Sequence, residues 1–228
     1  PIRTLWRDLC GVPHGFDGPG VVVADVDDHR AAPVGWTAVV QIGDAAVVAG
    51  PGATSRSGRL GGVDPASLVD PGLAGALLGP FADTLGPAHL FYGAPVHTPR
   101  HPVDGPIRAD DPRVQAILAE SDETERDECG IEDVTSGVWL AYDDDGEPGA
   151  VCGWTAWPHA TAHLSVLTAA SRRGRGLGRS AAVVAIAEAV DHGLMPQWRA
   201  AAWNTASIGL AARLGLTPVG HQLSVRLA

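Results

Sequence analysis

Short apolar runs, interrupted at close intervals by glycine and proline, occupy roughly the first hundred residues. Alternating or continuous runs of β-branched residues predict strands, and small clusters of alanine and leucine predict short helices. The expected strands are 21–26, 36–41, 45–49 and 89–92, and the expected helices are 65–69 and 75–85. Ile42-Gly43-Asp44, between the second and third of these strands, is typical of a hairpin turn.

Prolines crowd the stretch from Gly93 to Pro112, where they stand at positions 95, 99, 102, 106 and 112. Proline lacks a backbone donor and restricts its neighbour, so we expect a linker or an irregular surface crossing here. The pattern therefore divides the chain into a region of residues 1–105 and a region of residues 106–228.

The pattern becomes regular from Asp111 onward. Helices are expected at 114–120 and 123–129, followed by strands at 136–142, 150–157 and 162–168; a helix at 179–192, a strand at 197–203, a helix at 204–214 and a strand at 218–227 complete the order. This succession predicts an α/β or α+β sheet domain in the second region, with an extra N-terminal α/β region before it.

Two of these helices have clear boundary signals. In the helix 179–192, Val183, Val184, Ala187 and Val190 are expected on one apolar stripe, and Gly193 stands where a helix ends. In the helix 204–214, Asn204 is the expected N-cap and Gly215 the stop.

Composition places the chain among ordinary globular proteins. It has 228 residues, 45% of them hydrophobic and 18% charged, which excludes a disordered or fibrous chain. Its formal charge of −10 disfavours indiscriminate nucleic-acid binding. No apolar run approaches the ~18–20 residues that a membrane span needs, and the first residues lack a signal-peptide layout. We therefore expect no membrane and no nucleic-acid partner.

Cysteine and lysine usage exclude further chemistry. Cys10, Cys129 and Cys152 are far apart and odd in number, which argues against a disulfide framework or a metal site and predicts a cytoplasmic location. All 16 basic residues are arginine. Without lysine the chain has neither a Walker phosphate loop nor a lysine Schiff base.

A glycine- and arginine-rich loop connects the strand 162–168 to the following helix. Glycines that open a helix leave backbone N–H groups unpaired, and the helix dipole adds to their attraction for an anion such as pyrophosphate. In this acidic chain, four of the 16 arginines fall within 172–179. Arg173, Arg175 and Arg179 add side chains suited to phosphate; the alternative is a solvated basic loop.

The segment Gly176-Leu177-Gly178-Arg179-Ser180-Ala181 also fits the dinucleotide pattern GxGxxG/A. Two features count against that interpretation. Seven residues separate Thr168 from Gly176, and the acidic residue expected after the next strand is replaced by Trp203 and Asn204.

A second pattern covers more of the chain. Arg173-Gly174-Arg175-Gly176-Leu177-Gly178 resembles R/Q-x-x-G-x-G/A, the pyrophosphate loop of the GNAT superfamily of acyl-CoA N-acyltransferases. Downstream, the segment from Asn204 through Ser207 and Leu210 to Gly215-Leu216 resembles the family's N-x-x-S-x-x-L-Y-x-x-x-G-F. The resemblance begins at Asp111, is strongest over about 138–227 and is not readable in the first hundred residues.

The resemblance implies a GNAT-type fold, with a mixed central sheet flanked by helices and an opening between the strands 162–168 and 197–203. Acetyl-CoA would lie in that opening as the acyl donor. Residues 1–105 would shape the acceptor side, either as a separate α/β region or as a degenerate copy of the same fold. The cofactor-binding residues implied are Val166, Leu167, Thr168, Arg173, Gly174, Arg175, Gly176, Leu177, Gly178, Arg179, Asn204 and Ser207. Asn204 also fits a plain capping role.

The sequence departs from the family at one catalytic position. Many relatives protonate the departing thiolate with a tyrosine one place after the motif's leucine, but here that position is Ala211. The two tyrosines, Tyr92 and Tyr142, lie outside the motif. Another group or water must serve, or the protein is slow or inactive.

Candidates for a general base are few. His163, at the start of the strand 162–168, is the first candidate, with a packing role as the alternative; His221 is a weaker one. His97 and His101 have a metal-like spacing without a third ligand, so we expect loop residues and no metal. An acidic run over 122–133 fits either a solvated helix face or the border of a site for a cationic amine.

The resulting hypothesis is transfer of an acetyl group from acetyl-CoA to a primary amine of a small molecule or peptide, by direct attack. The alternative is a non-catalytic module that binds or senses acyl-CoA. A homodimer is the expected assembly if the chain associates.

Overall fold

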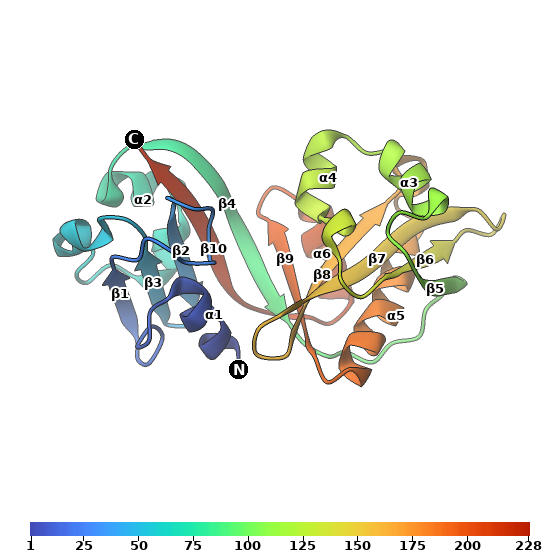
Figure 1. Cartoon of the computed structure of the whole chain (residues 1–228), viewed down its shortest axis with the longest axis horizontal. Helices are drawn as coiled ribbons and strands as arrows, with labels where there is room; N and C mark the ends of the chain where they lie inside the picture. Colours follow the sequence, from blue (N-terminus) through green and yellow to red (C-terminus); the bar gives the residue numbers. More distant parts are fainter. The chain divides into compact units, whose positions relative to one another are not determined.

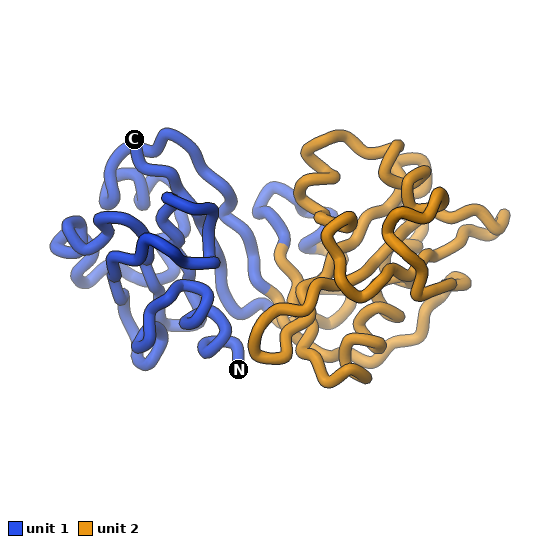
Figure 2. The backbone as a smooth tube through the Cα atoms, in the orientation of Figure 1, with its two compact units in different colours: residues 1–90, 200–208, 218–228 blue, residues 91–199, 209–217 orange.

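The computed structural model describes all 228 residues, which form two compact units (Figure 2). The first unit comprises residues 1–90, 200–208 and 218–228, and the second comprises residues 91–199 and 209–217. These boundaries differ from the expected division at residue 105. Two segments near the C-terminus, residues 200–208 and 218–228, belong to the first unit although they follow most of the second unit in the sequence. The last strand is the reason: it pairs with a strand from the first fifty residues.

In the first unit the strands lie in the order β1-β3-β2-β10-β4 (Figure 1). The pair β1–β3 is parallel, and β3–β2 and β2–β10 are antiparallel. Leu223 and Val225 of β10 are fully buried with Val39 and Val48 from the other strands. The strand bounds are β1 Gly20–Ala24, β2 Thr37–Ile42, β3 Ala45–Ala49, β4 Phe81–Tyr92 and β10 Thr217–Leu227.

Short helices accompany this sheet: α1 Ile2–Cys10, the 3₁₀ helices η1 Ala53–Arg59 and η2 Pro65–Val69, and α2 Pro71–Leu78. The expected helix 75–85 is wrong in its second half, where β4 begins at Phe81. Gly79, with φ 106°, ends α2. The sequence prediction missed this end because apolar residues continue on both sides of the glycine. The helix α1 was not expected from the sequence.

In the second unit the strands lie in the order β9-β8-β7-β6-β5, antiparallel throughout except for the parallel pair β8–β9. Their bounds are β5 Val103–Ile107, β6 Val138–Tyr142, β7 Pro148–Trp157, β8 Thr161–Thr168 and β9 Met195–Ala201. The helices are α3 Pro112–Ala119, α4 Glu123–Cys129, the 3₁₀ helices η3 Ile131–Asp133 and η4 Ala170–Arg172, then α5 Leu177–Asp191 and α6 Thr205–Arg213.

Helices cover both faces of this second sheet, α3 and α4 on one and α5 on the other (Figure 1). Leu167 packs in one cluster with Val114, Ile117 and Leu118 of α3. Its neighbour Thr168 points the other way, toward Gly178 at the start of α5. None of the helices is long and apolar enough to cross a membrane.

The stretch 93–112 is more ordered than expected, because it contains the strand β5. This strand lies at the edge of the sheet and pairs with β6, and an edge is where proline is tolerated. A Cβ on Gly105 would come within 2.7 Å of the Val138 carbonyl oxygen, so glycine permits the close approach. Gly105 and Pro106 are therefore the reason why the sequence pattern did not predict β5.

The buried face of α5 also differs from expectation. The predicted stripe is correct at Val183, which is buried, and wrong at Val190, which is 40% exposed, and at Ala187, which is also exposed. The buried face combines Val183 and Ile186 with small residues, Ala181, Ala182 and Ala185 among them. Alanines on this face let the helix pack closely on its neighbours.

Candidate functional site

The strand β8 has one edge that is only partly paired. Along its whole length it pairs with β7, from Thr161 to Thr168. On its other edge it pairs with β9 at only three positions, the last being His163 with Gln197. Beyond that point the backbone of Leu164–Thr168 has no ladder partner on β9. The N–H and C=O groups that face away from β7 are therefore available to a ligand that lies along this edge, except the Thr168 carbonyl, which accepts from Arg173 Nε at 3.4 Å.

The loop that follows β8 turns twice through left-handed backbone conformations. Gly174 has φ 78° and Gly176 has φ 88° and ψ 5°, both favoured by glycine. The first helical hydrogen bond of α5 runs from Ser180 N–H to the Gly176 carbonyl, at 3.1 Å. The N–H groups of Leu177, Gly178 and Arg179 precede it, and no side chain caps them. Such a helix start attracts an anion.

Gly178 packs the start of α5 directly onto β8. A Cβ at this position would lie 2.6 Å from Thr168 Oγ1, closer than atoms tolerate, and 3.9 Å from Val166 Cγ2. Glycine is therefore needed for a steric reason, because it lets the helix start lie directly against Thr168 at the end of β8.

The sequence suggested a concentration of positive charge in this loop. In the structure, carboxylates neutralise part of that charge. Arg172 Nε donates to Asp143 Oδ2 at 2.9 Å, and Arg173 pairs with Glu125 at 2.8 Å. Hydrogen bonds hold the pKa of the Asp143 carboxyl group below its usual range. The larger effect comes from the backbone N–H of Glu147 and the next from the guanidinium group of Arg172. The carboxylates thus neutralise part of the loop and fix its shape.

Arg175 and Arg179 remain as candidates for binding phosphate. The side chain of Arg175 is 56% exposed and lies 3.8 Å from Asp143 Oδ2, and Arg179 forms no ion pair. Their charges, with the backbone N–H groups, are the positive groups at the helix start.

His163 ends the short ladder between β8 and β9. Its Nδ1 hydrogen-bonds to Gln197 Oε1, and its ring stacks on Trp157 with 4.2 Å between centroids. Because that oxygen accepts, Nδ1 carries the proton and Nε2 keeps a lone pair. Burial, with the nearby charge of Arg199, lowers the pKa of His163 to about 4. The imidazole is therefore neutral at pH 7.

The motif offers no tyrosine that could donate a proton to the departing thiolate. Ala211 is fully buried on α6, and the hydroxyl of Tyr142 accepts a hydrogen bond from Arg113 at 2.8 Å. Asn204 accepts from Ser207 N–H at 3.0 Å, which is the expected N-cap. Asn204 and Ser207 belong to the first compact unit, so their role toward a cofactor stays a prediction.

Sequence reasoning missed two contacts of the proline-rich segment. His97 Nε2 donates to the Leu214 carbonyl at 2.9 Å, and His101 Nε2 donates to the Arg175 carbonyl at 3.0 Å. The two rings serve different partners rather than a shared ion. No sequence signal announces these bonds, since both acceptors are backbone atoms more than seventy residues away.

Two carboxylates of the acidic run have structural roles. Asp122 caps α4 by accepting from Glu125 N–H at 2.8 Å, and Glu125 itself pairs with Arg173. A third carboxylate, Glu120, accepts from Ser171 N–H at 3.0 Å, at the beginning of the loop. These acids therefore anchor the loop to α3 and α4.

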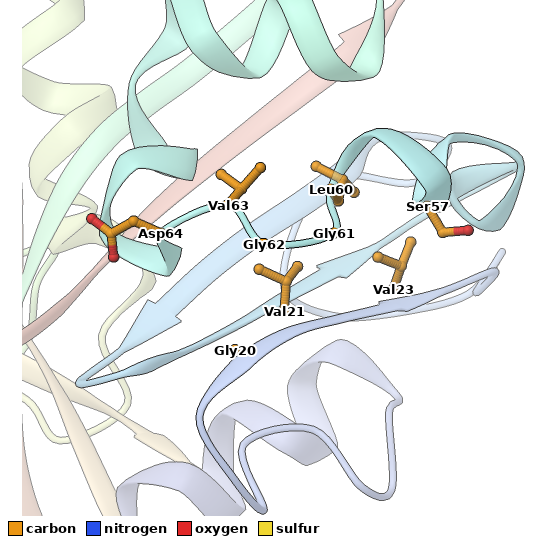
Figure 3. Close-up of a pocket in the computed structure, with 9 residues that line it drawn as sticks. All are labelled: Gly20, Val21, Val23, Ser57, Leu60, Gly61, Gly62, Val63 and Asp64. Atoms are coloured by element: carbon orange, nitrogen blue, oxygen red, sulfur yellow. The ribbon is translucent and has the colours of Figure 1, made fainter.

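A hollow of about 460 Å³ lies in the first unit, between β1 and the segment that joins η1 to η2 (Figure 3). Val21, Val23, Leu60 and Val63 contribute apolar side chains to its lining. Asp64, at its end, is engaged as the cap of η2, where it accepts from Ala66 N–H. The lining offers no pair of groups suited to acid–base chemistry.

Comparisons with known proteins agree with this geometry. Residues 107–216 match the model of the acetyltransferase (GNAT) family. A protein described as a GNAT-family acetyltransferase from Novosphingobium aromaticivorans has a TM-score of 0.50 and 20% identity, over 64% of this chain and 65% of that one. At that identity the likeness concerns the fold alone.

Two further solved structures have lower TM-scores. A GCN5-related N-acetyltransferase from Kribbella flavida has a TM-score of 0.47 and 22% identity, over 68% of this chain and 63% of that one. An acetyltransferase of Salmonella typhimurium, solved with its cofactor acetyl-CoA, has a TM-score of 0.41 and 17% identity, over 57% of this chain and 95% of that one.

The chain spans less than two thirds of the length of the Novosphingobium and Kribbella proteins. Among curated proteins, none matches the sequence. The family match and the Novosphingobium structure nevertheless confirm the expected GNAT-type fold. Residues 107–216 of this chain form a domain of the acetyltransferase (GNAT) family.

Proposed function

We propose that this chain binds acetyl-CoA along the open edge of β8 and transfers the acetyl group to a primary amine. The observation that carries the proposal is the adjacency of two features. The β8–β9 ladder stops at His163 with Gln197, and the glycine turn at Gly174 and Gly176 begins six residues after the strand ends. An extended arm that ends in a pyrophosphate suits that arrangement.

Each part of the site has a distinct task in this proposal. The backbone of Val166, Leu167 and Thr168 pairs with the pantetheine arm, and N–H groups on this edge polarise the thioester carbonyl. The N–H groups from Gly174 to Arg179 hold the pyrophosphate, with charge from Arg175 and Arg179. Arg173 already pairs with Glu125, so it contributes chiefly to the shape of the loop. Asn204 and Ser207 remain proposed contacts of the pantetheine.

In the transfer step the amine nitrogen attacks the thioester carbon. A C–N bond forms, the C–S bond breaks, the amine loses a proton and the departing thiolate gains one. His163 is the proposed base, because its Nε2 lone pair is available at neutral pH. A pKa of about 4 makes it a weak base, so it suits relay of a proton from an amine that already bears developing positive charge. Water would protonate the thiolate.

A second candidate function is binding of acyl-CoA without turnover. The buried Ala211 favours it, since this position carries the acid in many relatives. Acetyl-CoA binding is common to both candidates, and only turnover distinguishes them.

Release of free thiol from acetyl-CoA across a panel of primary amines and amino-terminal peptides tests the enzymatic proposal. We expect at least one acceptor to raise thiol release above the rate without amine, with an acetylated amine as the product. Tight binding with no acetylated product from any amine would favour the binding module.

A further inference from the structure

A short segment before β5 crosses the start of α5 and contacts the loop at residues 173–176. We call residues 97–101 the strap. Its backbone is attached to α5, because the N–H groups of Arg100 and His101 both donate to Ser180 Oγ, at 3.1 and 3.2 Å. Ser180 is fully buried in the first turn of the helix. The strap is thus fixed to the element that begins at the anion-binding turn.

His101 extends this attachment to the turn itself. Its Nε2–H donates to the Arg175 carbonyl at 3.0 Å, and its side chain is only 18% exposed. Nδ1 lies 4.0 Å from Asp144 Oδ1. A Cβ on Gly176 would be 3.8 Å from His101 Nε2, so the ring lies against this part of the loop.

The hydrogen bond from His101 to the Arg175 carbonyl also determines the direction of the Gly176 N–H group. Arg175 and Gly176 share one peptide unit, which is planar and trans, so its C=O and N–H point in opposite directions. A carbonyl held toward His101 turns the Gly176 N–H away from His101. On one side this peptide adjoins Gly176, whose left-handed backbone can rotate readily, and Gly174, one residue before Arg175, is also left-handed.

We propose that His101 is a positioning residue that orients the Gly176 N–H toward the pyrophosphate of acetyl-CoA. This inference rests on the proposed function for the identity of the anion. The orientation of the peptide, however, is a property of the chain without ligand.

Calorimetric titration of acetyl-CoA into the full chain and three variants tests the inference. We expect His101→Ala to weaken binding about five- to tenfold, the usual effect of losing one ordering hydrogen bond. We expect His101→Gln to restore most of the affinity, because its side-chain amide can donate to the same carbonyl. His97→Ala is the matched control: it removes a similar bond, to Leu214, and should leave the affinity within about twofold.

Backbone relaxation of the Gly176 amide without ligand gives a second readout. We expect fast motion of this amide to increase in His101→Ala and to be unchanged in His97→Ala. Unaltered affinity and unaltered motion in His101→Ala would overturn the inference, as would equal losses in both alanine variants or no rescue by glutamine. If the unmodified chain does not bind acetyl-CoA, the proposed function fails, while the relaxation result still decides the role of His101.

Discussion

His163 shows how one residue's surroundings set its protonation. Burial and the charge of Arg199 lower its pKa from 6.5 to about 4, so folding favours the neutral ring. Between those two values the unfolded chain binds a proton that the folded chain does not. This residue's contribution to stability is therefore present above about pH 6.5 and decreases as the pH falls toward 4.

We expect acidification to destabilise the protein less when this ring is removed. Urea unfolding from pH 7 to pH 4.5 should give a steeper loss of unfolding free energy for the unmodified chain than for His163→Asn. The difference in slope should approach about 1.4 kcal/mol per pH unit, the limit for one proton. Parallel pH profiles for the two proteins would mean that the imidazole titrates normally in the folded state.

The sequence predicts the glycines of the site better than its charges. Gly174, Gly176 and Gly178 follow from a local pattern, because the turn and the helix start involve consecutive residues. The carboxylates that pair with the loop arginines, Asp143 and Glu125, come from a turn and a helix about 30 to 50 residues earlier. Such pairings depend on tertiary contacts, so no local spacing indicates them.

At the scale of elements, strand and helix patterns predict most of the second unit. The expected helix 123–129 coincides with α4, and the strands β6, β7 and β8 differ from expectation only at their ends. Errors occur where glycine or proline lies inside a strand, as in β5 and the first part of β4. There the partner strand, rather than local propensity, determines the structure.

The close contact between Gly178 of α5 and Thr168 of β8 predicts that a glycine-to-alanine change in this helix lowers stability. Replacing glycine by alanine in a helix normally stabilises it, by about 0.5–1 kcal/mol. At Gly178 the new Cβ would meet Thr168 Oγ1 at 2.6 Å, so we expect Gly178→Ala to destabilise the protein by about 1–3 kcal/mol in urea unfolding.

Removing the opposing hydroxyl provides the internal control. Adding Thr168→Ala to Gly178→Ala should recover part of the loss, because the next contact, Leu210 Cδ2 at 3.7 Å, is ordinary. A stability gain in the single variant would show that α5 does not start against β8 as described.

For the molecule as a whole, sequence reasoning recognises the second unit and not the first. The motifs around Gly176 and Asn204 belong to a known family, whereas residues 1–90 carry no readable pattern beyond short strands. Pairing of β10 with β2 joins residues about 180 positions apart, from His221 to Gln41. Contacts at that separation arise from the complete fold, which explains why the expected boundary at residue 105 missed the return of the chain.

In the proposed function, the turn at Gly174–Arg179 holds the pyrophosphate of acetyl-CoA. Calorimetric titration of acetyl-CoA into the full chain, Gly176→Asp and Gly176→Asn tests it most directly. Aspartate and asparagine have the same shape and meet the same left-handed backbone, so the pair isolates a negative charge at the turn. Binding by the unmodified chain in the range of about 1 µM to 1 mM, retained in part by Gly176→Asn and abolished by Gly176→Asp, is the predicted result. No binding by the unmodified chain, or equal affinity of the two variants, would contradict the account.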